Sequence, residues 1–89
     1  MVYTLFQQEV VDYDAWRTIF DSMETVRSSA GARSDLILRS ADDPNAVTLL
    51  IGWDNIESAH SWMSDARLRE AMKAAGVKGQ PRITYLVES

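Results

Sequence analysis

The most apolar segment of the chain runs from Ala46 to Trp53 and reads AVTLLIGW. A strand with one face in water would alternate polar and apolar residues, and this segment does not. We therefore expect both of its faces to be covered. The preceding residues 42–45, Asp-Asp-Pro-Asn, have the composition of a turn and predict a tight connection to an earlier strand.

Three further segments carry the alternation and the β-branched or aromatic residues that are typical of strands. They are Val2–Val10, Ala32–Ser40 and Arg82–Glu88. The second of them is expected to form an antiparallel hairpin with Ala46–Trp53. Residues 77–81, Val-Lys-Gly-Gln-Pro, are expected to form a loop before the last strand.

The first helical segment follows the first strand. Asp12 is its predicted N-cap, because an Asp side chain at that place can accept from the free N–H groups of the first turn. Gly31 is expected to end the segment. Its apolar residues follow the i, i+3, i+4, i+7 rule and are Trp16, Ile19, Phe20, Met23 and Val26, with Arg27 among the polar residues of the opposite side.

The second helical segment is predicted to begin near Ile56, where Asp54 and Glu57 have the spacing of a capping box. Ser64 is expected to break it, and a second stripe then continues to Gly76. The apolar residues of that second stripe are Leu68, Ala71, Met72 and Ala75.

The order of elements is therefore β-α-β-β-α-β, which predicts an α+β fold. Right-handed crossovers place both helical segments on one face of a four-stranded antiparallel sheet. The other face would be bare and apolar, which indicates a partner site, and we expect a second copy of the chain there. The pattern leaves open whether that face carries Thr48, Leu50 and Gly52 or the alternate set Val47, Leu49, Ile51 and Trp53.

Length and composition narrow the class of protein. The 89 residues suit a single domain, residues 1–89. A chain of this size buries only roughly 60–65% of the surface that its unfolded form exposes, so association would add stability. The chain has no Cys, so it cannot form a disulfide, and its single His leaves no cluster that could hold a structural zinc ion. We expect no metal, and a reducing cytoplasm suits a chain without Cys.

The charge pattern argues against two classes of partner. The net charge is -4, and the nine Lys and Arg residues are scattered without a basic patch. We therefore expect neither nucleic acid nor an anionic membrane as a partner. Met1 is followed at once by strand-like sequence rather than by a secretory leader, and no apolar run approaches the roughly 20 residues that cross a bilayer.

Several short motifs carry a resemblance to a known family. The chain has D-Y-D-x-W at the entry to the first helix, G-W-D after the third strand, and A-M-K-A-A-G-V-K-G-Q-P over residues 71–81. Together with the strand pattern these resemble the dimeric α+β-barrel superfamily, and within it small bacterial proteins grouped with the antibiotic-biosynthesis-monooxygenase-like domains. The resemblance implies ferredoxin-like βαββαβ subunits that pack sheet against sheet as a homodimer. It also implies a pocket in each subunit between sheet and helices.

The chemistry of this superfamily is diverse, so the fold implies little about the reaction. Some relatives oxidise electron-rich aromatics without a cofactor, some degrade haem, and others are isomerases or dehalogenases. Haem-degrading relatives pair a first-strand Asn with a Trp and a later His. Here Gln7 or Gln8 replaces the Asn, and His60 precedes Trp62. The resemblance therefore favours a protein without a cofactor.

The candidate site residues are one titratable side chain and a group of aromatic and Met side chains. His60 is the candidate catalytic residue, because its unperturbed pKa suits acid or base work near neutrality. The alternative for His60 is a half-buried histidine bonded to a backbone carbonyl or to water. Flat apolar ligands suit stacking and sulfur contacts. The candidate ligand-binding residues are Trp16, Phe20, Trp53, Trp62, Met63, Met72 and Tyr85.

Two hypotheses follow from these residues. The first is a homodimeric domain that either only binds a small apolar or aromatic metabolite between sheet and helices, or binds it and oxidises it without a cofactor. The second is a non-catalytic binding or assembly module, in which the aromatic residues only stabilise the core and the interface. An open pocket lined by His60 and Trp62 would favour the first, and a filled interior would favour the second.

Overall fold

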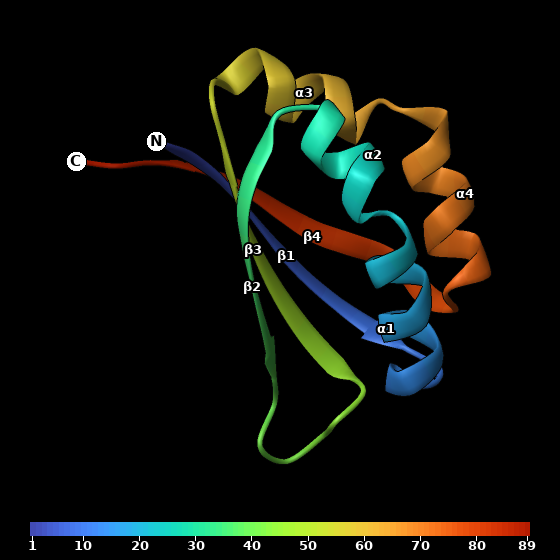
Figure 1. The fold of residues 1–89 in the computed structure, drawn as a ribbon. Helices are drawn as coiled ribbons and strands as arrows, with labels where there is room; N and C mark the ends of the chain where they lie inside the picture. Colours follow the sequence, from blue (N-terminus) through green and yellow to red (C-terminus); the bar gives the residue numbers. More distant parts are fainter.

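The computed structural model describes residues 1–89 and shows one sheet with helices on one of its faces (Figure 1). The elements in chain order are β1 (Val2–Val10), α1 (Tyr13–Ser22), α2 (Glu24–Ser29), β2 (Ala32–Arg39), β3 (Ala46–Trp53), α3 (Ile56–Met63), α4 (Ala66–Ala74) and β4 (Val77–Val87). The sheet order is β2-β3-β1-β4, and every neighbouring pair is antiparallel. The structure confirms the ferredoxin-like α+β fold, with each helical segment made of two short helices.

The side chains of β3 alternate between the two faces of the sheet, which decides the question that the sequence left open. The residues under the helices are Val47, Leu49, Ile51 and Trp53, and all four are buried. The residues on the bare face are Thr48, Leu50 and Gly52, since they alternate with the first set.

One end of the covered face is held by a buried hydrogen bond between neighbouring strands. The Trp53 side chain is 0% exposed, and its Nε1 donates to Thr4 Oγ1 of β1 over 3.0 Å. Thr4 is itself fully buried, so the two polar groups satisfy each other inside an apolar layer. The Trp53 ring also lies 6.4 Å from the ring of Trp62 on α3, which ties the helix to the sheet.

The bare face has an apolar centre. Leu36 of β2 pairs with Leu50 of β3, and Leu50 pairs with Leu5 of β1, so three leucines form a row across the sheet. Leu36 is 52% exposed in this single chain. We call these residues the leucine row.

Gly52 lies beside the leucine row on the same face. A Cβ atom at Gly52 would stand 2.5 Å from Ser34 Oγ and 2.8 Å from Met1 Sδ, closer than real Cβ atoms come. The glycine therefore lets the side chains of Ser34 and Met1 lie across the strand at this point.

The first helical segment differs from the single helix that its periodicity predicts. It breaks at Met23, which is at once the C-cap of α1 and the N-cap of α2. The carbonyl of Phe20 at the end of α1 accepts hydrogen bonds from the Met23 N–H and from Arg27 Nη1 of α2, so a side chain of the second helix stabilises the break. The predicted N-cap is correct, since Asp12 Oδ2 accepts from the Ala15 N–H.

The second helical segment breaks near Ser64 as the sequence predicts, between α3 and α4. The capping box at its start is wrong. Asn55 is the N-cap of α3, with its Oδ1 accepting from the Ser58 N–H over 2.8 Å. Asp54 instead pairs with Arg33 of β2 at 2.6 Å, because it lies one residue too early to reach the first turn.

The predicted loop at residues 77–81 is also wrong, because β4 begins at Val77. Val10 pairs with Val77, and the pairing of β1 with β4 then shifts between Gln7 and Glu9. A bulge at this point accommodates Gly79, whose φ is +63°, and Pro81, which has no N–H to donate. Glycine and proline therefore mark an irregularity within a strand here rather than its absence.

The helices of this chain are short. None of them has the length and apolar character that would let it span a membrane.

Candidate functional site

A small cavity lies between the covered face of the sheet and the helices. Its volume is about 50 Å³, it is partly open to solvent, and 12 of its 14 lining residues are hydrophobic. The sheet contributes Phe6, Gln8, Leu49 and Ile51. The helical side contributes Trp16, Ile19, Phe20, Met23, Arg27, Trp62, Leu68, Ala71, Met72 and Ala75.

The aromatic wall of the cavity comes from α1. Trp16 and Phe20 are four residues apart, so one turn of helix brings them onto the same side. Their rings lie nearly parallel, with centroids 5.1 Å apart and planes 16° apart. The apolar side of α4 also lines the cavity, with Leu68 and Met72, so two helical stripes that the sequence pattern identifies bound it.

Two polar side chains line this otherwise apolar cavity, Gln8 and Arg27. Gln8 lies between Phe6 and Val10 at every second position of β1, so the three side chains share the covered face. Arg27 is 5% exposed, and burial lowers the pKa of its guanidinium. The charged form of Arg27 is thus kept in surroundings that disfavour it.

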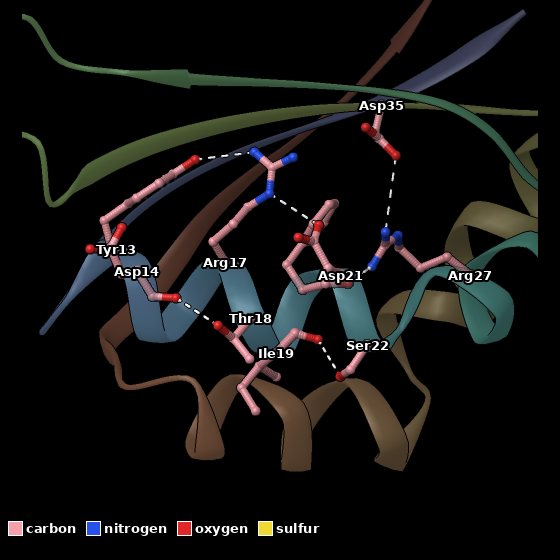
Figure 2. Close-up of polar contacts among 10 residues, drawn as sticks. Tyr13, Asp14, Arg17, Thr18, Ile19, Asp21, Ser22, Arg27 and Asp35 are labelled. Carbon is pink, nitrogen blue, oxygen red and sulfur yellow. Dashed lines mark hydrogen bonds and ion pairs between the residues drawn. The ribbon is translucent and has the colours of Figure 1, made fainter.

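Arg27 is held by three contacts. Its Nη1 donates to the Phe20 carbonyl, its Cζ lies 3.6 Å from the centre of the Phe20 ring, and its Nη2 lies 4.0 Å from Asp35 Oδ2 on β2. Figure 2 shows the side chain reaching from α2 toward Asp35. The carboxylate of Asp35 is about half-exposed, so it compensates the buried charge of Arg27 only in part.

Four of the sequence-predicted site residues meet at this cavity, namely Trp16, Phe20, Trp62 and Met72. The other four predicted residues do not line it. Trp53 is fully buried in the core, where its indole N–H is bonded to Thr4. Met63 packs partly buried against that core.

His60 and Tyr85 form a separate pair outside the cavity. Both are exposed, and their rings meet edge to face with centroids 4.7 Å apart. His60 is exposed rather than half-buried, and its side chain makes no hydrogen bond to another group of the protein.

Sequence reasoning missed the two polar residues of the cavity. Gln8 carried a usable signal, because it is the polar member of a set whose neighbours Phe6 and Val10 are apolar. Arg27 carried a signal as well, because it follows Phe20 by seven residues and Met23 by four, which places it on the apolar stripe of an unbroken helix. The assignment of Arg27 to the polar side of the helix is therefore wrong, and the structure buries this residue.

No general base is present in the cavity. Glutamine does not titrate, and arginine stays protonated at all ordinary pH values. The arrangement can therefore bind, orient and electrostatically stabilise a molecule, but its own side chains cannot take up a proton from it. No group of three or more His, Asp or Glu side chains is placed to hold a metal ion.

Comparison by sequence finds no relatives. The chain matches no protein-family model. It matches no curated protein either.

Comparison by structure finds many similar proteins, at low sequence identity. The cofactor-independent oxygenase SnoaB from Streptomyces nogalater has a TM-score of 0.81 at 12% identity, over 99% of this chain and 92% of that one. Rv0793 from Mycobacterium tuberculosis has a TM-score of 0.69 at 16% identity, over 100% of this chain and 96% of that one. An antibiotic biosynthesis monooxygenase has a TM-score of 0.77 at 10% identity, over 100% and 99%. The chain thus has the ferredoxin-like α+β fold of the antibiotic-biosynthesis-monooxygenase-like proteins.

Proposed function

We propose that this protein binds a small, flat and largely apolar molecule in the cavity between the sheet and the helices. The observation that carries the proposal is an apolar cavity walled by the stacked rings of Trp16 and Phe20 and containing only two polar side chains. Ligand sites typically combine an apolar lining with a few polar groups that fix orientation. The similarity in fold to a cofactor-independent oxygenase supports a function in small-molecule binding.

The volume of the cavity sets a condition on this proposal. An engineered cavity of about 150 Å³ takes up benzene, whereas the volume here is about 50 Å³. A benzene-sized ligand therefore requires side chains to move. Met23 and Met72 line the cavity and are half-buried, and methionine changes rotamer more readily than branched or aromatic residues do.

A binding experiment with a matched pair of variants tests the proposal. Ala71 and Ala74 both lie on α4, but only Ala71 lines the cavity, so Ala71→Leu fills it and Ala74→Leu leaves it open. Benzyl alcohol titrated into ¹⁵N-labelled protein should shift amide resonances around the cavity, with a Kd of roughly 1 mM for a ligand of this size. Ala71→Leu should abolish those shifts, and Ala74→Leu should keep them. Equal shifts in the two variants, or none in the wild type, would remove the cavity from the function.

Oxidation of the bound molecule is the finer part of the proposal. Because the cavity holds no base, a substrate oxidised there must enter already deprotonated, with the substrate anion as reductant and dioxygen as oxidant. Dioxygen uptake with a polyhydroxylated aromatic should then rise with pH through the pKa of the substrate. It should be lost in Ala71→Leu and unchanged in His60→Ala, since His60 lies outside the cavity. A His60→Ala variant that loses uptake would return His60 to the mechanism.

A homodimer through the bare face is the second part of the proposal. Leu38 and Leu86 on this face are 51% and 39% exposed, and they flank the leucine row. Apolar side chains gathered on one face typically mark an association site. A second copy of the chain supplies a matching apolar centre, because a two-fold interface pairs the same surface with itself.

The small volume favours one alternative, an assembly module in which the helical layer only completes the core. In that protein the dimer forms, but no apolar probe perturbs the residues around the cavity. The benzyl alcohol titration separates the two functions, since light scattering would show the same dimer in both cases.

A further inference from the structure

Arg27 is the only charged residue that lines the cavity, and much of its hydrogen-bonding capacity is unused. A guanidinium has five N–H groups, and only Nη1 of Arg27 donates to a protein acceptor, the Phe20 carbonyl. Its Nη2 lies 4.0 Å from Asp35 Oδ2, which is too long for a hydrogen bond. Its Nε has no acceptor in the protein.

The two unused nitrogens are not sealed off from a ligand. Every fully enclosed side-chain nitrogen or oxygen of this protein has a hydrogen-bond partner. Nε and Nη2 are therefore not fully enclosed, although the whole Arg27 side chain is only 6% exposed. They also form one edge of the guanidinium, and this edge binds a carboxylate through two parallel hydrogen bonds.

Helix capping alone explains only part of this arrangement. Arg33 offers a comparison within the same chain, because its Nη1 donates to the carbonyls of Ser28 and Ala32 while its side chain stays 45% exposed. Binding a carbonyl at a helix end therefore does not require burial of the guanidinium. Arg27 is nevertheless buried, and it lies against the Phe20 ring and the cavity.

We propose that Arg27 binds the carboxylate of a small aromatic acid whose ring occupies the apolar part of the cavity. This inference rests on the proposed binding function and adds the chemical class of the ligand. Nε and Nη2 receive the two carboxylate oxygens, while Nη1 stays on the Phe20 carbonyl. The aromatic ring then lies among the side chains of Trp16, Phe20 and Met72.

Substitution of Asp35 tests the proposal independently of Arg27. Its carboxylate is the nearest negative charge to Arg27, so it competes with a ligand carboxylate and repels it. Asp35→Asn should therefore tighten the binding of an anionic ligand by roughly 3- to 10-fold, as expected for one like charge near the surface. The binding of a neutral ligand of the same size should not change.

The experiment compares sodium benzoate with benzyl alcohol by calorimetry at neutral pH and low salt. The wild type should bind benzoate at least about 10-fold more tightly, because two charge-assisted hydrogen bonds are gained. Arg27→Met should weaken benzoate binding by roughly 10- to 100-fold and leave benzyl alcohol binding in place. Arg17→Met on the exposed side of α1 is the matched control and should change neither value.

The outcomes separate this inference from the proposed function. Equal affinity of the wild type for the two compounds would overturn the role of Arg27 while leaving the binding cavity intact. Retention of the benzoate preference in Arg27→Met would do the same. Binding of neither compound would overturn both proposals. If Arg27→Met fails to fold, the wild-type preference and the response of Asp35→Asn still decide the question.

Discussion

The two faces of the sheet are built from the same strands but have different surroundings. On the covered face, Ile51 and Trp53 are almost completely enclosed by the helices. On the bare face, Leu36 and Leu38 are more than half-exposed, although they are equally apolar. The apolar character of a strand residue therefore does not tell which face it occupies in this chain.

The difference shows why β3 lacks the usual alternation. Its neighbour β1 has the polar residues Gln7 and Glu9 on the bare side near its end, and the buried residues Gln8 and Val10 on the covered side. β3 has apolar residues on both sides, and only one set is used by the helices. The second set is explained by the proposed partner, so the following substitutions test the two faces separately.

The largest effect is expected on the covered face. Trp53→Ala should lower the free energy of unfolding by about 3–5 kcal/mol, because it removes a fully buried ring and leaves the Thr4 hydroxyl without its partner. Urea denaturation followed by circular dichroism measures the change. Tyr85→Ala removes an exposed aromatic residue and should cost no more than about 1 kcal/mol. Equal losses in the two variants would contradict the burial difference.

A substitution on the bare face should act on assembly rather than on folding. Leu50→Asp places a charge in the middle of the leucine row, so the dimer should weaken by at least about 100-fold while the monomer keeps its sheet. Light scattering and circular dichroism together check this result. Ala74→Asp adds the same charge to the exposed side of α4 and should leave the dimer intact. A wild-type protein that is a monomer of 10.0 kDa at micromolar concentration would contradict the proposed dimer.

A smaller effect is expected where the bare face is packed by its own side chains. Gly52→Ala forces the new methyl group against Ser34 Oγ and Met1 Sδ, and should cost about 1–2 kcal/mol of unfolding free energy. Ser34→Gly in the same chain should recover part of that loss, since it removes the closest atom. A double-mutant cycle by thermal denaturation measures the coupling. Additive effects would show that the two positions do not interact.

The smallest effect lies outside both faces, at the N-cap of α4. Hydrogen bonds from the Arg67 side chain and backbone hold the pKa of Asp65 below its ordinary value of 3.8. Because the folded pKa is the lower one, Asp65 stabilises the fold above pH 3.8, and this contribution is lost as the pH falls through the folded pKa. Asp65→Asn should flatten the acid limb of stability against pH. An unchanged acid limb would mean that Asp65 contributes nothing measurable.

Most of the architecture was predictable from local patterns. The strand limits Val2–Val10 and Ala46–Trp53, the Asp12 cap and the break near Ser64 agree with the structure because each depends on residues close together in the chain. The errors at Asp54 and at residues 77–81 have a different origin. They arise from contacts between residues far apart in the chain. Asp54 forms an ion pair with Arg33, and pairing with β1 continues β4 through a bulge.

The candidate site was predicted only in its apolar part. Trp16, Phe20 and Met72 lie on helical stripes that face the sheet, so periodicity places them at the cavity. Periodicity also places Arg27 there, since it follows Phe20 by seven residues and Met23 by four, but a charged side chain is usually assigned to the solvent side. His60 had the right chemistry for catalysis, but the turn of α3 directs it away from the cavity.

The contact of Met1 with the bare face matters for handling the protein. Met1 Sδ lies against Gly52, and the N-terminal amine is 3.7 Å from Glu88 Oε1, so both ends of the chain meet beside the leucine row. A purification tag fused to either end would emerge at the edge of the proposed interface. Oligomeric state should therefore be measured after tag cleavage, with as few leftover residues as the protease site allows.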